Sequence, residues 1–267
     1  MPVDLEPYTS LVPAWLMVLF RLTGIFVFTP LFSSGMLPPR IKVLLALSMS
    51  FCVFPMLLTA GKTSSYLMVG FLDTGLSLWG LVPAVGGELL IGMIIGYAAI
   101  LPLIGMQLGG RVISQQLGLG LAEVFNPGEE QSGLVSQFLY LLALAIFLLV
   151  GGHRVLLNVL VGSFDHIPLG GTVAVASAMD MIVGLLGAAF ALAMRVAGPL
   201  LCLIFLETVT LGFIARTVPQ LNILSVGFAV RILIGASVLI GSVGIAAGVF
   251  TDMLQEMLGQ LRWFFGD

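Results

Sequence analysis

LLIGMIIGYAAILPL (89–103) and LVSQFLYLLALAIFLLVGG (134–152) are two apolar stretches without charge, and the polar, glycine-rich run GMQLGGRVISQQLGLGLAEVFNPGEEQ (105–131) lies between them. The flanking stretches are typical of helices that cross or lie in a membrane. Non-helical backbone at membrane depth is tolerated only where protein buries it or where it lines a water-filled cavity. The polar run is therefore the first candidate for a segment that faces a pore.

The composition of the chain excludes an ordinary soluble fold. Of its 267 residues, 59% are hydrophobic and 9% are charged, whereas soluble domains have about 25% charged residues. Lipid, detergent or partner proteins must therefore cover much of the surface. The net charge of −3 and the lack of a basic cluster argue against a nucleic-acid partner. Cys52 and Cys202 each lie in an apolar run and are interpreted as small buried hydrophobic residues.

About six apolar segments have the length and composition of candidate transmembrane segments. Asp4 and Glu6 precede the first of them, where a cleavable signal would place positive charge, so we expect that segment to be mature structure. A weaker candidate covers 66–82. The six segments are Leu11–Phe32, Val43–Ala60, Leu89–Ile104, Leu134–Gly152, Met181–Phe205 and Ile232–Phe250.

Charges and prolines interrupt these segments. Arg21 lies in the first and Arg195 in the fifth, while Glu207 and Arg231 also have apolar surroundings. Ionisable groups in such places face a partner or a water-filled path. We favour ion pairs at helix or subunit interfaces, and a proton or ion relay is the alternative. Interrupted spans and scattered positive charges are also typical of a chain that is buried in an assembly rather than in lipid.

The connectors predict an all-α protein of long, kinked helical hairpins. Asn126-Pro127 predicts a helix start, and Glu129 and Glu130 next to it either complement the helix dipole or contact a partner. That helix should run to about Val150. Two further apolar helices, from about Met181 and from about 224 to 263, should form a hairpin with its turn at 216–222. Small-residue pairs predict close helix packing, namely Gly92 with Gly96, Gly105 with Gly109, and Gly244 with Gly248.

The chain lacks the sequence patterns of an enzyme. It has no phosphate-binding loop of the GxxxxGK[ST] type and no GxSxG nucleophile turn. His153 and His166 have no further histidine or cysteine at metal-ligand spacing, and Glu88, Glu123, Glu207 and Asp180 are isolated in the sequence. We expect no catalytic residue, no metal site and no cofactor.

Two stretches resemble a known family. One contains EEQS (129–132), the apolar helix after it and GGH (151–153); the other is ARTVPQLNILSVGF (215–228). Both are similar to the FliR family of flagellar biosynthetic proteins, including its turn Arg-x-x-Pro-Gln-Leu-Asn. The order of the segments also fits over nearly the whole chain. The counterparts of this family in virulence secretion systems have a similar plan.

The resemblance implies a subunit of the flagellar type III export gate, in the bacterial inner membrane and flagellar basal body. Region 1–180 would be FliP-like and contain a pore plug at about 105–122, and region 181–267 would be a FliQ-like hairpin. FliP and FliQ would share one hetero-oligomeric complex with the chain, largely above the bilayer plane. FlhB would contact the cytoplasmic mouth, and unfolded export substrates and membrane lipid would be further contacts.

The resemblance and the residue chemistry lead to two groups of candidate site residues. In the run at 105–122, glycines permit the backbone to bend, and Met106 offers an adaptable seal. The glutamine amides, Ser114 and the guanidinium of Arg111 provide hydrogen bonds in place of water. The plug candidates are Gly105, Met106, Gln107, Gly109, Gly110, Arg111, Ser114, Gln115, Gln116, Gly118 and Gly120. The partner-contact candidates are Arg195, Glu207, Arg216, Pro219, Gln220 and Asn222.

Three alternatives stay open. The run at 105–122 could be an ordinary connector between helices. The whole chain could be an ion or small-molecule transporter of the inner membrane, which would predict polar residues in broken helices of two corresponding halves; the glycine–glutamine run occurs once, which disfavours this class. An intramembrane enzyme would need a catalytic pair, and the sequence offers none.

Overall fold

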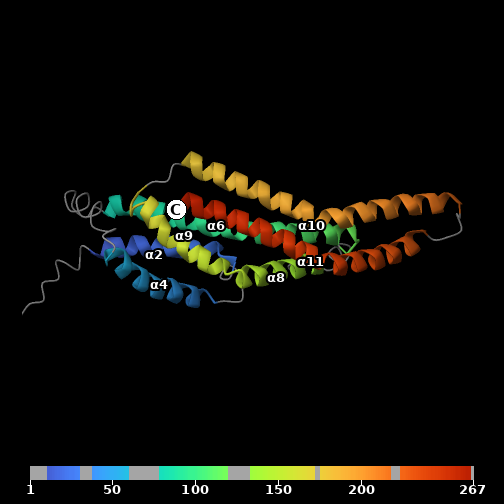
Figure 1. The fold of residues 1–267 in the computed structure, drawn as a ribbon. Coiled ribbons are helices and arrows are strands. Elements are labelled where there is room, and N and C mark those ends of the chain that lie inside the picture. The colour runs from blue at the N-terminus through green and yellow to red at the C-terminus, as the bar shows by residue number, and fades with distance from the viewer. Residues whose placement is uncertain are drawn as a thin grey trace, which may run out of the picture. The chain divides into compact units, whose positions relative to one another are not determined.

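A computed structural model describes residues 11–30, 38–59, 78–119, 133–171, 175–217 and 223–265 of the chain. The N-terminal half contains helices α2 (Leu11–Phe28), α4 (Pro39–Thr59) and α6 (Leu78–Gln116), as Figure 1 shows. The other helices are α8 (Leu134–Leu149), α9 (Gly152–His166), α10 (Val175–Thr217) and α11 (Ile223–Phe265).

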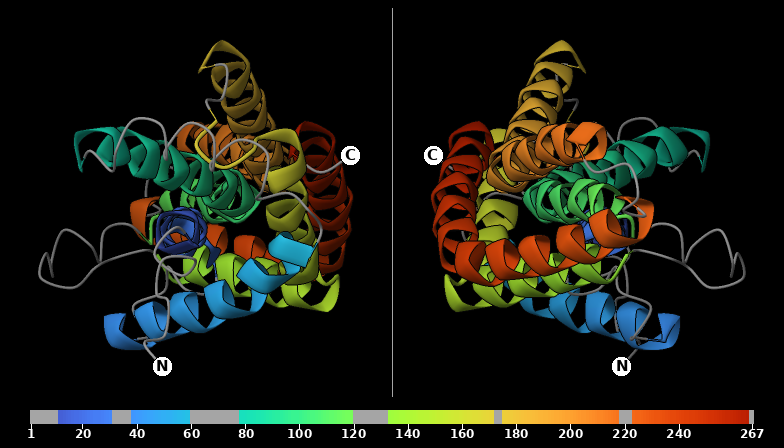
Figure 2. Two further views of the ribbon diagram at one scale, coloured as in Figure 1. Left: turned by 90° about the vertical axis from the view of Figure 1, so that its left-hand side faces the viewer. Right: turned by 90° about the vertical axis from the view of Figure 1, so that its right-hand side faces the viewer.

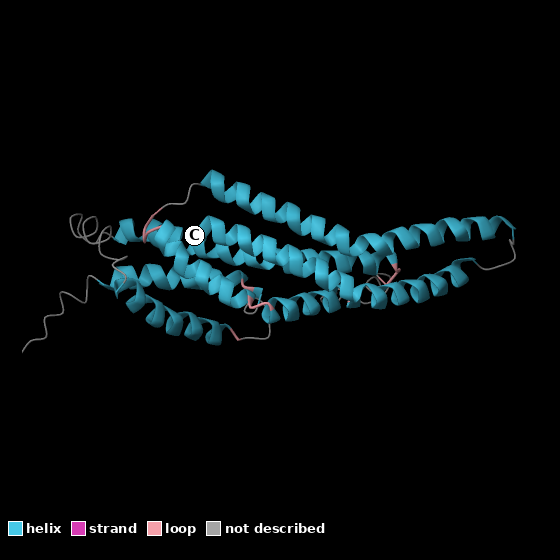
Figure 3. Cartoon of the chain, in the orientation of Figure 1, coloured by secondary structure: helices cyan, strands magenta, loops and turns pink. Residues whose placement is uncertain are grey.

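Every regular element within these described ranges is helical, and none is a strand (Figure 3). This confirms the predicted all-α fold. In the described part of the chain, five helices are long and apolar enough to cross a membrane, and the number is six if α8 and α9 count as one broken span. Between α8 and α9 the chain bends by 64° at Gly151, whose φ of 78° is a conformation that glycine adopts readily. About six apolar segments were predicted, in agreement with this number.

The chain forms two compact units that alternate along the sequence. Unit 1 comprises 1–100, 151–185 and 257–267, and unit 2 comprises 101–150 and 186–256. Helices α6, α10 and α11 each contribute to both. The division into a FliP-like region 1–180 and a FliQ-like region 181–267 stays a prediction, because it concerns likeness to other subunits.

In unit 1, helix α2 packs between two neighbours. Figures 1 and 2 show α4 beside α2, and Trp15 stacks against Phe51 with ring centroids 5.1 Å apart. On another side α2 meets α6 with almost no space between the backbones. A Cβ atom at Gly96 would lie 2.7 Å from the Ile25 carbonyl oxygen, and one at Gly92 would overlap the carbonyl oxygen of Arg21. This close contact confirms the packing predicted for the first glycine pair.

In unit 2, glycines of α6 allow two other helices to come close. A Cβ at Gly105 would lie 2.7 Å from the Ala189 carbonyl oxygen of α10, and one at Gly110 would lie 2.6 Å from the Cα of Ser136 on α8. The second predicted pair, Gly105 with Gly109, therefore packs closely. Nothing lies within 4 Å of a Cβ built at Gly244 or Gly248, so the third pair makes no close contact with another helix among the described residues.

Several local expectations differ from the structure. Cys52 and Cys202 are exposed on the chain, which corrects their interpretation as buried residues; both lie on apolar helix faces that the single chain leaves open. Helix α8 begins at Leu134, and the helix start predicted at 126–130 lies outside the described residues. Helices α10 and α11 match the predicted C-terminal hairpin, and residues 218–222 of its turn also lie outside.

Candidate functional site

The first part of the polar run is helical. Residues 105–116 form the C-terminal third of α6, which has 39 residues, whereas the sequence predicted a bending loop from Gly105 onward. Glycine destabilises an isolated helix by leaving its backbone free and uncovered. Here the neighbouring helices cover it, because Gly105 and Gly109 contact α10 and Gly110 contacts α8. Residues 105–116 are therefore part of a helix and not the ordinary connector between helices that the sequence left as an alternative.

Helix α6 ends at a left-handed glycine. Gly118 has φ 77°, its N–H donates to the Gln115 carbonyl at 3.1 Å, and the N–H of Leu119 donates to the Ser114 carbonyl at 3.1 Å. These two bonds and the positive φ form a Schellman motif, which satisfies carbonyl groups that a helix end leaves free. A defined cap thus ends α6, and the rest of the predicted plug, including Gly120, lies outside the described residues.

The plug candidates divide into a buried and an exposed group. Met106 is fully buried in unit 2, so in this chain its side chain contributes to the core. Gln107 is half-buried and its carbonyl accepts a hydrogen bond from Ser136 Oγ at 3.0 Å. The other buried candidates are Gly105, Gly109, Gly110 and Ser114. The exposed polar tip of α6 consists of Arg111, Gln115 and Gln116.

The partner-contact candidates in unit 2 include one ion pair. Arg231 of α11 donates from Nε to Glu207 Oε2 of α10 at 3.1 Å and from Nη2 to Thr208 Oγ1 at 2.9 Å. This pair confirms the predicted ion pairing at a helix interface for Glu207 and Arg231. The second Glu207 oxygen, Oε1, is buried without a hydrogen-bond partner in the described structure.

Arg195 lies on an exposed face of α10 and has no carboxylate partner among the described residues. Its Nη1 approaches the Met253 sulfur at 3.8 Å, and a thioether is a weak acceptor. Arg216 is exposed near the end of α10. Pro219, Gln220 and Asn222 lie outside the described residues, so their predicted roles stay predictions.

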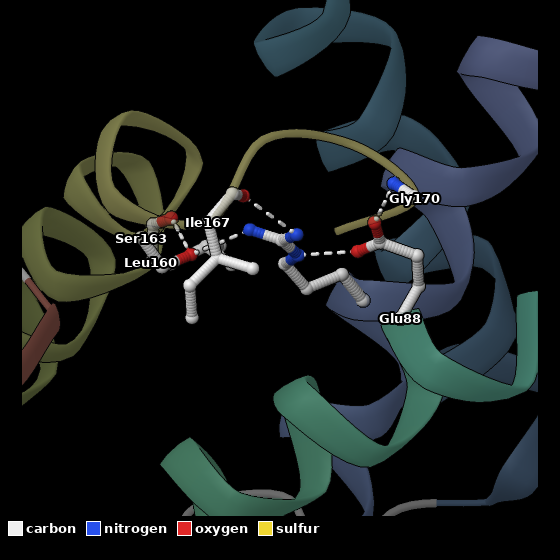
Figure 4. A network of polar contacts seen from close by, with 6 residues as sticks. Glu88, Leu160, Ser163, Ile167 and Gly170 are labelled. Carbon is white, nitrogen blue, oxygen red and sulfur yellow. Dashed lines mark hydrogen bonds and ion pairs between the residues drawn. The ribbon is translucent and has the colours of Figure 1, made fainter. Parts of the chain in front are cut away.

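A buried ion pair in unit 1 was missed from the sequence. Arg21 of α2 and Glu88 of α6 are both fully buried, with Arg21 Nε 2.5 Å from Glu88 Oε2. The remaining Arg21 nitrogens donate to Ser163 Oγ and to the Ile167 carbonyl, each at 3.1 Å. Figure 4 shows these partners around the guanidinium. Arg21 was identified as needing a partner, and Glu88 was set aside because no acidic residue stands near it in the sequence.

The network around Arg21 joins three helices and one connector. Glu88 Oε1 accepts a hydrogen bond from the Gly170 N–H at 2.8 Å, after the end of α9 (Figure 4). The guanidinium also lies 4.2 Å from the ring centroid of Phe164, a cation–π contact. Each guanidinium nitrogen and both carboxylate oxygens therefore have a partner. Such a closed network holds the three helices in register.

Within the described ranges no three His, Cys, Asp or Glu side chains gather so that they could hold a metal ion. Among the described residues the arrangement provides packed glycines, an exposed polar tip, the ion pairs of Arg21 with Glu88 and of Arg231 with Glu207, and Arg195 without a carboxylate partner. Such groups can pack helices together, hold them in a fixed orientation and contact polar partners.

Comparison with known proteins identifies relatives along nearly the whole chain. The family described as "Bacterial export proteins, family 1" matches residues 12–257. The flagellar biosynthetic protein FliR of Bacillus subtilis (strain 168) is 30% identical over 265 residues, which cover 95% of each chain. FliR of Aquifex aeolicus (strain VF5) is 27% identical, covering 92% of this chain and 91% of its own. FliR of Escherichia coli (strain K12) is 25% identical, covering 97% and 95%.

Proposed function

The chain belongs to family 1 of the bacterial export proteins, and from this premise we propose that it is a subunit of the flagellar type III protein export gate. The observation that carries the proposal is the match to a flagellar relative along 95% of each of the two chains. The family match over residues 12–257 reaches every described helix. As a member of an export family it is a transport component and not a catalyst.

The proposed role in the gate is to form part of the channel wall and to help close it. The exposed polar tip of α6, Arg111, Gln115 and Gln116, supports this role because these side chains can hydrogen-bond where water would otherwise enter. The tip has a rigid base, since Gly109 and Gly110 fix α6 against α10 and α8. Segment 105–122 thus stays our proposed plug, in which the buried residues support the exposed ones.

The uncovered apolar surface supports hetero-oligomeric assembly with FliP and FliQ. In the most apolar 18-residue stretch of α11, only 11% of the residues are buried in the chain, and in the corresponding stretch of α4 17% are buried. Large exposed apolar patches mark protein or membrane contacts. Partner helices would cover these faces, and lipid would cover what remains in the inner membrane. FlhB at the cytoplasmic mouth is part of the same proposal, close to the end of α10 and the exposed Arg216.

The position of Arg195 in the sequence favours contact with a partner protein over contact with a lipid headgroup. The charge-free runs on its two sides, 181–194 and 196–206, are both shorter than the about 20 residues that a bilayer span needs. A membrane position that brings Arg195 to a lipid headgroup would therefore bring Asp180 or Glu207 into the hydrocarbon. A carboxylate on a neighbouring subunit would satisfy Arg195 without that cost.

Native mass spectrometry of the purified chain, after co-expression with FliP and FliQ from the same genome, tests the proposal. We expect one hetero-oligomer that contains this chain together with both partners. A chain that remains monomeric or forms a homo-oligomer while FliP and FliQ assemble without it would contradict the proposal. That result would favour the alternative of a small-molecule or ion transporter.

A further inference from the structure

Arg195 stands on an exposed face of α10 in unit 2, and its neighbours on that face are small. Side chains three, four and seven positions apart lie on the same side of a helix. Ala191 and Cys202, four residues before and seven after Arg195, are exposed, and Gly198, three residues after it, is partly exposed. We name these four residues, Ala191, Arg195, Gly198 and Cys202, the arginine face.

The guanidinium of Arg195 lacks a strong acceptor within the described part of the chain. Its Nη1 approaches the Met253 sulfur at 3.8 Å, and a thioether is a weak acceptor. Asp252, the residue before Met253, is exposed, and no ion pair joins it to Arg195. The adjacent Met194 is apolar and 58% exposed. A charge in such surroundings is costly unless it has a partner, so we expect the partner to come from outside the chain.

The small residues of the arginine face determine what kind of partner can reach Arg195. A Cβ built at Gly198 would meet no atom within 4 Å, and Ala191 carries a single methyl group. Helix axes are commonly about 8–10 Å apart, and small side chains bring them to the lower end of this range. An aspartate or glutamate side chain is short, so its helix must come close to touch the guanidinium. Bulky side chains elsewhere on α10, such as Phe190, which is 55% exposed, would hold a helix further away.

We propose that the arginine face receives one helix of a partner subunit, which crosses α10 at Arg195. This helix carries one Asp or Glu at the crossing, and Gly, Ala or Ser stands one turn to either side of that carboxylate. The planar guanidinium donates two parallel hydrogen bonds to it. Such a charge pair selects one partner and one register, because a helix without the carboxylate would leave Arg195 buried and unpaired. The inference rests on the proposed export-gate function and adds the chemistry of the partner.

Crosslinking without a spacer identifies the carboxylate in the assembled complex. Arg195→Lys keeps a positive charge and supplies an amine, which a carbodiimide joins only to a carboxylate that touches it. The chain is co-expressed with FliP and FliQ, the purified complex is treated, and the joined peptides are identified by mass spectrometry. Arg231→Lys is the positive control, because Arg231 pairs with Glu207 of the same chain. The unaltered chain, which has a guanidinium at both positions, gives the background.

We expect Arg195→Lys to be joined to one Asp or Glu of a different subunit, with a yield several-fold above the background. The joined peptide should have a small residue three or four positions before and after that carboxylate. Joining to Asp252, whether of the same chain or of a second copy, would overturn the proposal. The lack of any product at Arg195→Lys, in a complex in which Arg231→Lys is joined to Glu207, would overturn it as well.

The small size of Ala191 gives an independent test of the close approach. Ala191→Leu adds bulk to the arginine face, and Ala145→Leu, at an exposed alanine of α8 in the same unit, is the matched control. Leucine is a good helix former, so neither change should unfold the chain. Native mass spectrometry should show several-fold less intact complex with Ala191→Leu than with Ala145→Leu, and equal amounts would overturn the proposed helix crossing.

The two tests separate failure of the arginine face from failure of the export function. If the chain assembles with FliP and FliQ but gives neither the crosslink nor the effect of Ala191→Leu, the arginine face is wrong and the export function stands. If the unaltered chain joins neither FliP nor FliQ, both proposals are wrong.

Discussion

Arg21 and Glu88 form an ion pair in which both side chains are fully buried, although 67 positions separate them in the sequence. A buried pair adds little net stability by itself, because desolvation offsets most of the attraction. Once it exists, however, loss of one partner leaves the other charge without compensation. The pair therefore fixes the register of α2 against α6, and Gly170 extends the same constraint to the connector after α9.

Glu88→Gln should destabilise the chain by about 3–5 kcal/mol, since it leaves the buried guanidinium without its counter-charge. Thermal unfolding of the purified complex in detergent measures the effect. Glu256→Gln is the control, because Glu256 is an exposed carboxylate on α11 and should change stability by less than about 1 kcal/mol. Equal losses in the two variants would mean that the pair contributes no more than an exposed charge.

Gly92→Ala should destabilise unit 1 by about 1–3 kcal/mol, as overpacking does in a tight contact. The added methyl group would overlap the carbonyl oxygen of Arg21, a backbone atom that cannot move without α2. Gly244→Ala is the matched control on α11, where a Cβ meets nothing within 4 Å and alanine favours the helix by up to about 1 kcal/mol. Unfolding temperatures of the two variants should therefore shift in opposite directions, and a shift in the same direction would refute the contact.

The glycines show how far the sequence could predict this fold. Apolar runs and small-residue spacing predicted the helices and two of the three close contacts, because both depend on local composition. The segment from Gly105 to Gln116, predicted as a loop, is helical because α8 and α10 cover its glycines. That cover is a tertiary contact, which local composition does not predict. Local composition also does not tell which glycine ends a helix, and here it is Gly118.

The candidate site likewise contains some features that the sequence could predict and others that it could not. Arg21 and Glu207 were recognisable as charges that need partners, because each stands in an apolar setting. The choice of Glu88 as the partner of Arg21 depends on how α2 lies against α6, which no local pattern contains. The exposed tip at Arg111, Gln115 and Gln116 follows from burial of the opposite face of α6, so it too required the packed structure.

Arg195→Gln should weaken assembly with the partner subunits while the chain itself stays folded. Arg195 is exposed and its described contact is the Met253 sulfur, so its loss removes little from the chain. Loss of a charge pair buried at an interface costs about 2–5 kcal/mol of binding. Native mass spectrometry of the co-expressed complex should show less intact assembly than with Arg262→Gln, an exposed arginine on α11. Full assembly with both variants would rule out an interfacial pair at Arg195.

Replacing the polar tip of α6 should make the resting gate leak ions. The variant carries Arg111→Ala, Gln115→Ala and Gln116→Ala, three exposed positions whose side chains we propose to close the channel. Deletion of the segment would be a poor test, because it would also remove Gly109 and Gly110 and with them the contacts to α10 and α8. Alanine keeps the helix and removes only the hydrogen-bonding groups.

Ion flux across the inner membrane, in cells that express the complex without export substrates, gives the measurement. Flux should rise in the triple variant and stay at the resting level with Gln255→Ala and Gln260→Ala, two exposed amides on α11. Native mass spectrometry must show the same assembly for both, so that a leak is not mistaken for a broken complex. If the fully assembled triple variant showed only the resting ion flux, closure of the channel would be assigned to other residues. The side chains of the tip would then not be needed to exclude ions.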